Sequence, residues 1–126
     1  MASRILVIED NPTNLELMIY LLKAFGHATV TAADGEQGIE TARRTMPDLI
    51  LCDIALPKLD GFGVARRLKA DAVLCAVPLI AVTASAMVGD RDKVLEAGFD
   101  GYIAKPISVR ALPAQLAQFL PGGRDA

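Results

Sequence analysis

Short, continuous runs of apolar residues alternate along the chain with longer segments in which apolar residues recur every three or four positions. Continuous apolar runs are typical of strands covered on both faces, and the longer spacing is typical of amphipathic helices. The pattern predicts strands over residues 5–8, 28–31, 49–52, 79–82 and 102–104. It predicts helices over residues 12–25, 35–45, 62–70, 87–97 and 107–120.

Strict alternation of strands and helices indicates a parallel sheet with helices on both faces, joined by right-handed crossovers. We therefore expect an α/β fold, a single doubly wound (βα)5 domain with a five-stranded parallel sheet. We expect this domain to span residues 1–121, followed by a short tail over residues 122–126.

Pro113 disturbs the last helical segment, because a proline inside a helix removes a hydrogen bond and clashes with the preceding turn. Two outcomes are open. Either the final helix begins late, with Pro113 in its first turn, or the helix is kinked there.

Composition excludes several classes of protein. The chain has 126 residues, 52% of them hydrophobic, which suits one packed domain. The net charge of −2 gives no reason to expect nucleic acid or a membrane as partner. The first residues lack the pattern of a signal peptide, and the longest apolar run, residues 72–82, is too short for a bilayer. We expect a cytoplasmic protein.

Chemically distinctive residues follow four of the five predicted strands. Glu9 and Asp10 follow the first, Asp53 the third, Thr83 the fourth and Lys105 the fifth. Ligands of parallel sheets bind beyond the carboxyl ends of the strands, which share one edge. Three carboxylates, a hydroxyl and an ammonium group should therefore converge there.

Such a group of residues can bind Mg²⁺ and accept a phosphoryl group. Clustered carboxylates repel one another, and Mg²⁺ relieves this repulsion while keeping waters and phosphate oxygens as further ligands. Two charges on Mg²⁺ and one on Lys105 balance the carboxylates of Glu9, Asp10 and Asp53. Aspartate is also a covalent nucleophile in phosphoryl transfer. The chain contains no glycine-rich phosphate-binding loop.

These residues stand in segments that resemble the receiver domain of two-component response regulators. The similarity extends over residues 4–120, and all four segments occur in the order and spacing of that family. The segments are Val7-Ile8-Glu9-Asp10-Asn11, then residues 48–57 with Asp60-Gly61, then Ala81-Val82-Thr83-Ala84, and Tyr102-Ile103-Ala104-Lys105-Pro106.

The resemblance implies a flavodoxin-like receiver fold with strand order 2-1-3-4-5, and it implies a role for each matching residue. Asp53 would be the phosphoryl acceptor, and Mg²⁺ would be bound by Glu9, Asp10, Asp53 and the carbonyl of Ala55. The catalytic set would be Asp53, Thr83 and Lys105, with Thr83 and Tyr102 forming the switch. Pro106 would follow a cis peptide bond, and the small Ser85 would affect the lifetime of the phosphoaspartate.

The implied function is that of a phosphorelay switch, which catalyses only its own phosphorylation and dephosphorylation. The expected partners are a histidine kinase or histidine phosphotransfer protein, and a downstream protein bound on the face of the fourth helix, fifth strand and fifth helix. We expect a monomer or weak homodimer. The short tail makes the chain resemble stand-alone receivers. Asp10-Asn11 with Asn14, together with Lys105-Pro106-Ile107-Ser108, is similar to the cell-division regulators of the DivK type.

Other interpretations remain open. The chain could be a degenerate receiver that binds a partner without phosphorylation, or the receiver of a hybrid histidine kinase. A haloacid-dehalogenase-type hydrolase is disfavoured, because its acid/base aspartate would stand where Ala55 does. A flavodoxin-like electron carrier is disfavoured because the acidic groups would repel a flavin phosphate. We expect His27 to be an exposed loop residue, and Cys52 and Cys75 to be buried apolar residues.

Overall fold

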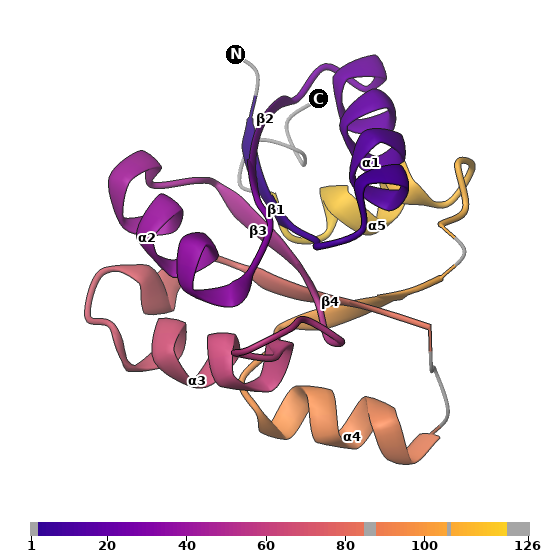
Figure 1. Cartoon of the computed structure of the whole chain (residues 1–126). Coiled ribbons are helices and arrows are strands. Elements are labelled where there is room, and N and C mark those ends of the chain that lie inside the picture. Colours follow the sequence, from indigo (N-terminus) through magenta and orange to yellow (C-terminus); the bar gives the residue numbers. More distant parts are fainter. Residues whose placement is uncertain (1–2, 85–87, 106, 121–126) are drawn as a thin grey trace.

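The computed structural model describes residues 3–84, 88–105 and 107–120, with the backbone alone for 88–91 (Figure 1). Its strands are β1 (Arg4–Ile8), β2 (Ala28–Ala32), β3 (Leu49–Asp53), β4 (Leu79–Thr83) and β5 (Gly101–Ala104). Its helices are α1 (Pro12–Ala24), α2 (Gly35–Thr45), α3 (Gly61–Ala70), α4 (Val88–Glu96) and α5 (Leu112–Ala117), with a short 3₁₀ helix η1 (Leu74–Ala76). Ser85, Pro106 and the tail over 122–126 lie outside the described residues.

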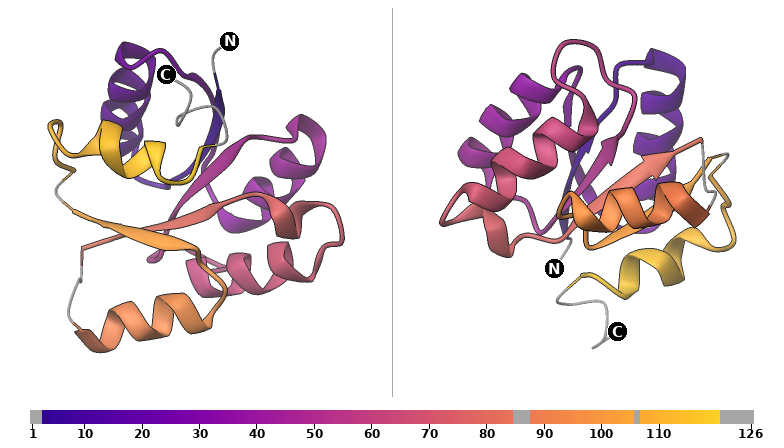
Figure 2. Two further views of the ribbon diagram at one scale, coloured as in Figure 1. Left: turned by 180° about the vertical axis from the view of Figure 1, so that it is seen from behind. Right: turned by 90° about the horizontal axis from the view of Figure 1, so that it is seen from below.

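The five strands form one sheet in the order β2-β1-β3-β4-β5, and every neighbouring pair is parallel. This order confirms the predicted fold. Helices α1 and α5 cover one face of the sheet, and α2, α3 and α4 cover the other (Figures 1 and 2). In the described part of the chain, no helix combines the length and the hydropathy that a membrane crossing requires.

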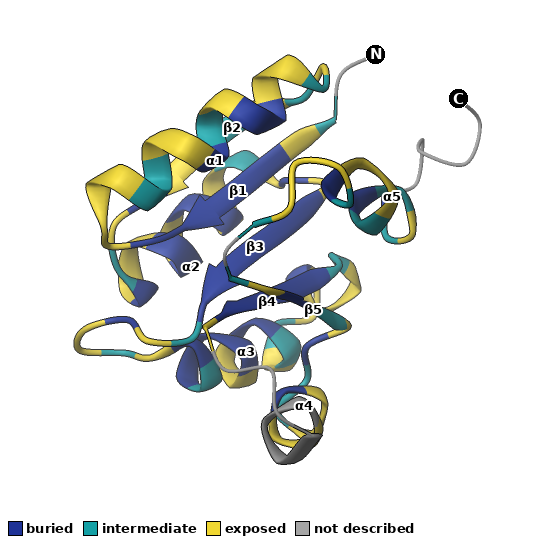
Figure 3. Ribbon diagram, turned by 90° about the vertical axis from the view of Figure 1, so that its right-hand side faces the viewer, coloured by how far each residue is buried: buried dark blue, intermediate teal, exposed yellow. Residues whose placement is uncertain are grey.

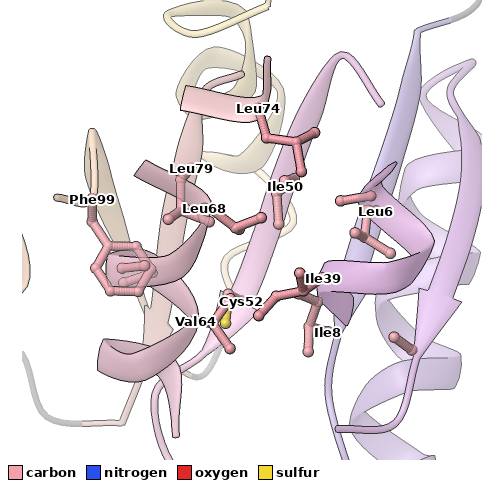
Figure 4. Close-up of a cluster of buried hydrophobic side chains, with 14 of the residues drawn as sticks. Leu6, Ile8, Ile39, Ile50, Cys52, Val64, Leu68, Leu74, Leu79 and Phe99 are labelled. Carbon is pink, nitrogen blue, oxygen red and sulfur yellow. The ribbon is translucent and has the colours of Figure 1, made fainter. Parts of the chain in front are cut away.

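The central strands are buried on both faces, so successive residues feed two separate apolar layers (Figure 3). Leu6 and Ile8 of β1 join the layer beneath α2 and α3, which Figure 4 shows in detail. Ile5 and Val7 join the layer beneath α1 and α5. This double burial explains why the strands appear in the sequence as continuous apolar runs.

Local signals set the helix starts. Asn11, Asp34 and Asp60 precede α1, α2 and α3, and each side chain accepts a hydrogen bond from the backbone N–H three residues later. This contact satisfies an N–H group that has no partner inside the helix. A capping side chain therefore fixes the first turn of each of these three helices.

The last helix is shorter than predicted. It spans Leu112–Ala117, so the expectation of a helix over 107–111 is wrong. Pro113 lies in its first turn, which confirms the late start and excludes the kink. Proline is tolerated there because its missing N–H would have no helical partner. The hydroxyl of Ser108 accepts a hydrogen bond from the N–H of Ala111 and closes the turn before the helix.

Candidate functional site

The carboxyl ends of β1, β3, β4 and β5 meet at one edge of the sheet, as the strand register requires. Ile8 pairs with Cys52, Asp53 with Val82, and Thr83 with Ala104. Glu9 and Lys105 follow β1 and β5 directly, and Asp53 and Thr83 are the last residues of their strands. The sheet therefore brings residues that are far apart in the sequence to the same edge.

Three carboxylates form what we call the acidic cluster: Glu9, Asp10 and Asp53. One carboxylate oxygen of each lies within 4.8 Å of the others. Glu9 and Asp53 are 4% and 7% exposed, whereas Asp10 is exposed. Hard oxygen ligands at this spacing, open to water on one side, fit Mg²⁺. The residues present are thus compatible with the metal that the sequence predicts.

Lys105 reaches into the acidic cluster. Its Nζ lies 3.0 Å from Oε1 of Glu9 and 3.5 Å from Oδ2 of Asp53. Burial lowers the pKa of Lys105, but the hydrogen bond to Glu9 and the charges of Asp53 and Glu9 outweigh it, so the pKa is raised. The ammonium group therefore stays protonated and neutralises part of the cluster's charge.

Burial raises the pKa of Glu9, and neighbouring Asp53 raises it further. Two contacts act in the opposite direction: the ion pair with Lys105, and a hydrogen bond of 3.3 Å from the N–H of Asn11 to Oε2. Burial dominates because a nearly enclosed carboxylate loses most of its hydration. A bound cation would relieve this cost directly.

The loop after β3 holds Asp53 in place. Oδ1 of Asp53 accepts a hydrogen bond of 3.2 Å from the N–H of Ala55. The loop turns back tightly at Gly61, whose N–H donates to the carbonyl of Ile54 at 2.9 Å. A Cβ atom at Gly61 would lie 2.7 Å from the Asp53 carbonyl oxygen. Only glycine fits this approach, so Gly61 keeps the loop packed beneath the acidic residue.

Thr83 and Tyr102 differ in their distance from the cluster. Thr83 is 9% exposed, and its carbonyl accepts a hydrogen bond of 2.8 Å from the N–H of Lys105. Tyr102 stands two residues before the end of β5, half-buried, and packs against the apolar layer beneath α2, α3 and α4. Thr83 thus belongs to the edge that carries the cluster, whereas Tyr102 borders the neighbouring core.

A small pocket beside the cluster includes residues that sequence reasoning did not assign to the site. It has a volume of about 130 Å³ and is lined by Glu9, Asn14, Leu17, Met18, Val82, Lys105 and Ile107. Leu17 is an apolar residue on α1 that is 46% exposed. The signal in the sequence is the helical spacing of Asn14, Leu17 and Met18, which places all three on one side of α1.

Comparisons with known proteins agree with this geometry. A family model described as "Response regulator receiver domain" matches residues 5–117. The chain is 42% identical over 109 residues to the polar-differentiation response regulator DivK of Brucella ovis, covering 86% of this chain and 89% of DivK.

Solved structures show the same likeness. The receiver domain of a sensor histidine kinase from Pseudomonas aeruginosa, described with a magnesium ion coordinated in the active site cleft, is 38% identical with a TM-score of 0.87. The match covers 94% of this chain and 98% of that one. A receiver domain of a histidine kinase from Syntrophus aciditrophicus is 32% identical with a TM-score of 0.87. This match covers 96% of the present chain and 92% of the Syntrophus chain. On its sequence, its fold and the edge at which its acidic residues meet, the chain belongs to the response regulator receiver domain family.

Proposed function

We propose that Asp53 accepts a phosphoryl group from a histidine kinase or a histidine phosphotransfer protein in the cytoplasm. A carboxylate oxygen of Asp53 attacks phosphorus, the P–N bond to the donor imidazole breaks, and the electron pair returns to that nitrogen. The chain then catalyses only its own phosphorylation and the later hydrolysis of the acyl phosphate. We assign this activity to a receiver domain over residues 1–121, with 122–126 as its tail.

The acidic cluster is the metal site in this proposal. Glu9, Asp10 and Asp53 offer carboxylate oxygens within 4.8 Å of one another. The carbonyl of Ala55 would be the fourth protein ligand. Mg²⁺ bound there supplies positive charge that screens the phosphoryl oxygens from the carboxylates. Asp10, the exposed member, adds negative charge on the solvent side.

Lys105 and Thr83 contact the phosphoryl oxygens that Mg²⁺ does not bind. The ammonium of Lys105 is already 3.5 Å from Asp53, so it can pair with a phosphoryl oxygen with little movement. Its backbone N–H is bonded to the Thr83 carbonyl, which couples the ends of β4 and β5. Thr83 donates its hydroxyl to a second phosphoryl oxygen, and catalysis rests on positioning and charge.

The switch follows from the place of Thr83 and Tyr102 on neighbouring strands. Movement of Thr83 toward the phosphoryl group changes the space beside β5, and Tyr102 responds by turning inward. The surface of α4, β5 and α5 then changes shape for a downstream protein. Such a change is a shift between two populated states, so a partner that prefers one state also stabilises it.

The single observation that carries the proposal is the convergence of two buried carboxylates, Glu9 and Asp53, on one lysine at an open edge of the sheet. The test is the intact mass after incubation with acetyl phosphate, with Mg²⁺ or with a chelator. We expect one added phosphoryl group, only with Mg²⁺, in the unmodified chain and in Asp92→Asn, which removes an exposed acid on α4.

Asp53→Asn keeps the shape of the side chain and removes the nucleophile, so it should gain no mass. An adduct of equal yield in Asp53→Asn would show that another residue is the acceptor. No adduct in any variant, together with no binding of beryllofluoride, would leave a receiver that acts only by binding.

A further inference from the structure

Helices α3 and α4 cover the same face of the sheet (Figure 2). Residues of both helices line a groove. Its volume is about 380 Å³, and it is lined by Phe62, Arg66, Lys93, Glu96 and Ala97. Among the lining residues, Phe62 packs edge-on against Phe99, with ring centroids 6.5 Å apart. None of these residues belongs to the acidic cluster or to the loops that carry it.

Two cations line the groove, and neither has a partner among the residues that the structure describes. Neither Arg66 nor Lys93 forms an ion pair or a hydrogen bond with any residue whose side chain the structure describes. Both residues are exposed, Arg66 on α3 and Lys93 on α4. Their charges therefore remain available to a ligand that lies between the two helices.

The α3 side of the groove is positively charged. Helix α3 carries Arg66, Arg67 and Lys69 and no acidic residue; Lys69 is paired with Asp100, so the two arginines supply the positive charge. On the other helix, Glu96 adds one carboxylate to the lining. Glu96 repels the charge of any anion, but a peptide differs from a phosphate polymer in having backbone N–H groups that can donate to Glu96 while its carboxylates pair with the cations.

Packing around α4 leaves room for such a ligand. Among the side chains of α4 that are described, residues 92–96, only Val94 is buried, and Leu95 is 46% exposed. Phe62 and Ala97 are half-buried, so the apolar part of the groove's lining is accessible. An aromatic or aliphatic side chain on Phe62 would bury apolar surface on both partners.

We propose that the groove between α3 and α4 binds an acidic peptide segment of a partner protein. The segment's carboxylates pair with Arg66 and Lys93, and an apolar side chain between them lies on Phe62. The site is separate from the phosphorylation site, and binding there does not require Asp53.

The test is a titration of the ¹⁵N-labelled full chain with the blocked peptide Glu-Asp-Phe-Asp-Glu, followed by backbone amide shifts. We expect saturable shifts confined to α3, α4 and the residues around Phe99. Arg66→Glu and Lys93→Glu should each weaken binding by roughly tenfold, because each loses one attraction and gains one repulsion. Arg67→Glu is the matched control on α3, since Arg67 does not line the groove.

Three results would overturn the proposal. Equal weakening by Arg67→Glu would mean general attraction to a basic helix. Equal binding of Glu-Asp-Ser-Asp-Glu would mean that Phe62 contributes nothing. Shifts centred on the acidic cluster, or lost in Asp53→Asn, would place the peptide elsewhere. Since Asp53→Asn abolishes phosphorylation and leaves the groove intact, failure of one proposal is distinguishable from failure of the other.

Discussion

Replacing Lys105 by methionine tests how the charge of the acidic cluster is balanced without metal. Methionine keeps most of the side chain's length and removes the ammonium group, which contacts Glu9 at 3.0 Å and Asp53 at 3.5 Å. Both carboxylates are buried, and no other cation forms an ion pair with them among the described residues. The substitution therefore leaves two buried negative charges side by side.

Removing one partner of a buried ion pair costs about 3–5 kcal/mol. The side chain of Lys105 is 22% exposed and the cluster opens to water, so the lower end of this range applies. We expect a loss of about 3 kcal/mol in the free energy of unfolding, equivalent to roughly 10 °C in Tm for a chain of this size. Lys58→Met, an exposed lysine with no ion pair among the described residues, should change stability by less than about 0.5 kcal/mol.

The assay is urea unfolding at neutral pH in a chelator and again in Mg²⁺. Mg²⁺ should stabilise Lys105→Met more than the unmodified chain, because the variant lacks the competing cation and binds the metal more tightly. At a Mg²⁺ concentration 100 times its Kd, binding adds about 2.7 kcal/mol to the free energy of unfolding. If the variant in chelator lies within about 0.5 kcal/mol of the unmodified chain, the ammonium does not neutralise the cluster and the reasoning is wrong.

The pH dependence supplies an independent check. The folded-state pKa of Glu9 is raised, so the folded chain binds a proton there more readily than the unfolded chain. As the pH falls through that pKa, Glu9 becomes neutral, and the difference in free energy of unfolding between Lys105→Met and the unmodified chain should shrink. The pKa of Lys105 is raised above 10.5, so its stabilising effect should persist up to that pH and be lost only as pH rises through the raised value.

Three further predictions follow from particular side chains. Burial lowers the pKa of His27, the only histidine, so its ring ¹H shifts should titrate below pH 6.5. The free energy of unfolding should fall as the pH drops below the unfolded-state pKa of this histidine. Titration above pH 6.5 would contradict the prediction. Cys75 is exposed and Cys52 fully buried, so one thiol per chain should react with a thiol reagent in native conditions and two in urea. Gly38→Ala should destabilise the chain by about 1–3 kcal/mol in a thermal melt, because its Cβ would clash with Cδ1 of Ile8; an unchanged Tm would mean that Ile8 can move aside.

The sheet and the place of the site could be predicted from the sequence because both depend on short-range patterns. Buried parallel strands require uninterrupted apolar runs, and the residue after each run must lie at the carboxyl edge. Asp53 and Thr83 are the last residues of β3 and β4, and Lys105 follows β5. Their convergence therefore follows from strand order alone.

Contacts that depend on side-chain conformation could not be predicted in this way. Glu9 and Lys105 are 96 positions apart, and their ion pair depends on the rotamers that two long side chains adopt. His27 was expected to be exposed, but it is half-buried and its Nδ1 is enclosed without a partner among the described atoms. Cys75 was expected to be buried, but it is exposed on η1, a 3₁₀ helix with no periodic signal in the sequence.

The uneven packing of the helices gives a physical reason for a switch at α4. Helices α2 and α3 each bury five residues in the core, several of them glycines or alanines that allow close approach to the sheet. In the described part of α4, Val94 is the only buried side chain. Displacing residues 92–96 of α4 therefore exposes less apolar surface than displacing α2 or α3, and it costs less free energy. Because α4 is the helix that follows Thr83 in the chain, the proposed movement of Thr83 would act first on a helix of which only Val94 is buried among the described side chains.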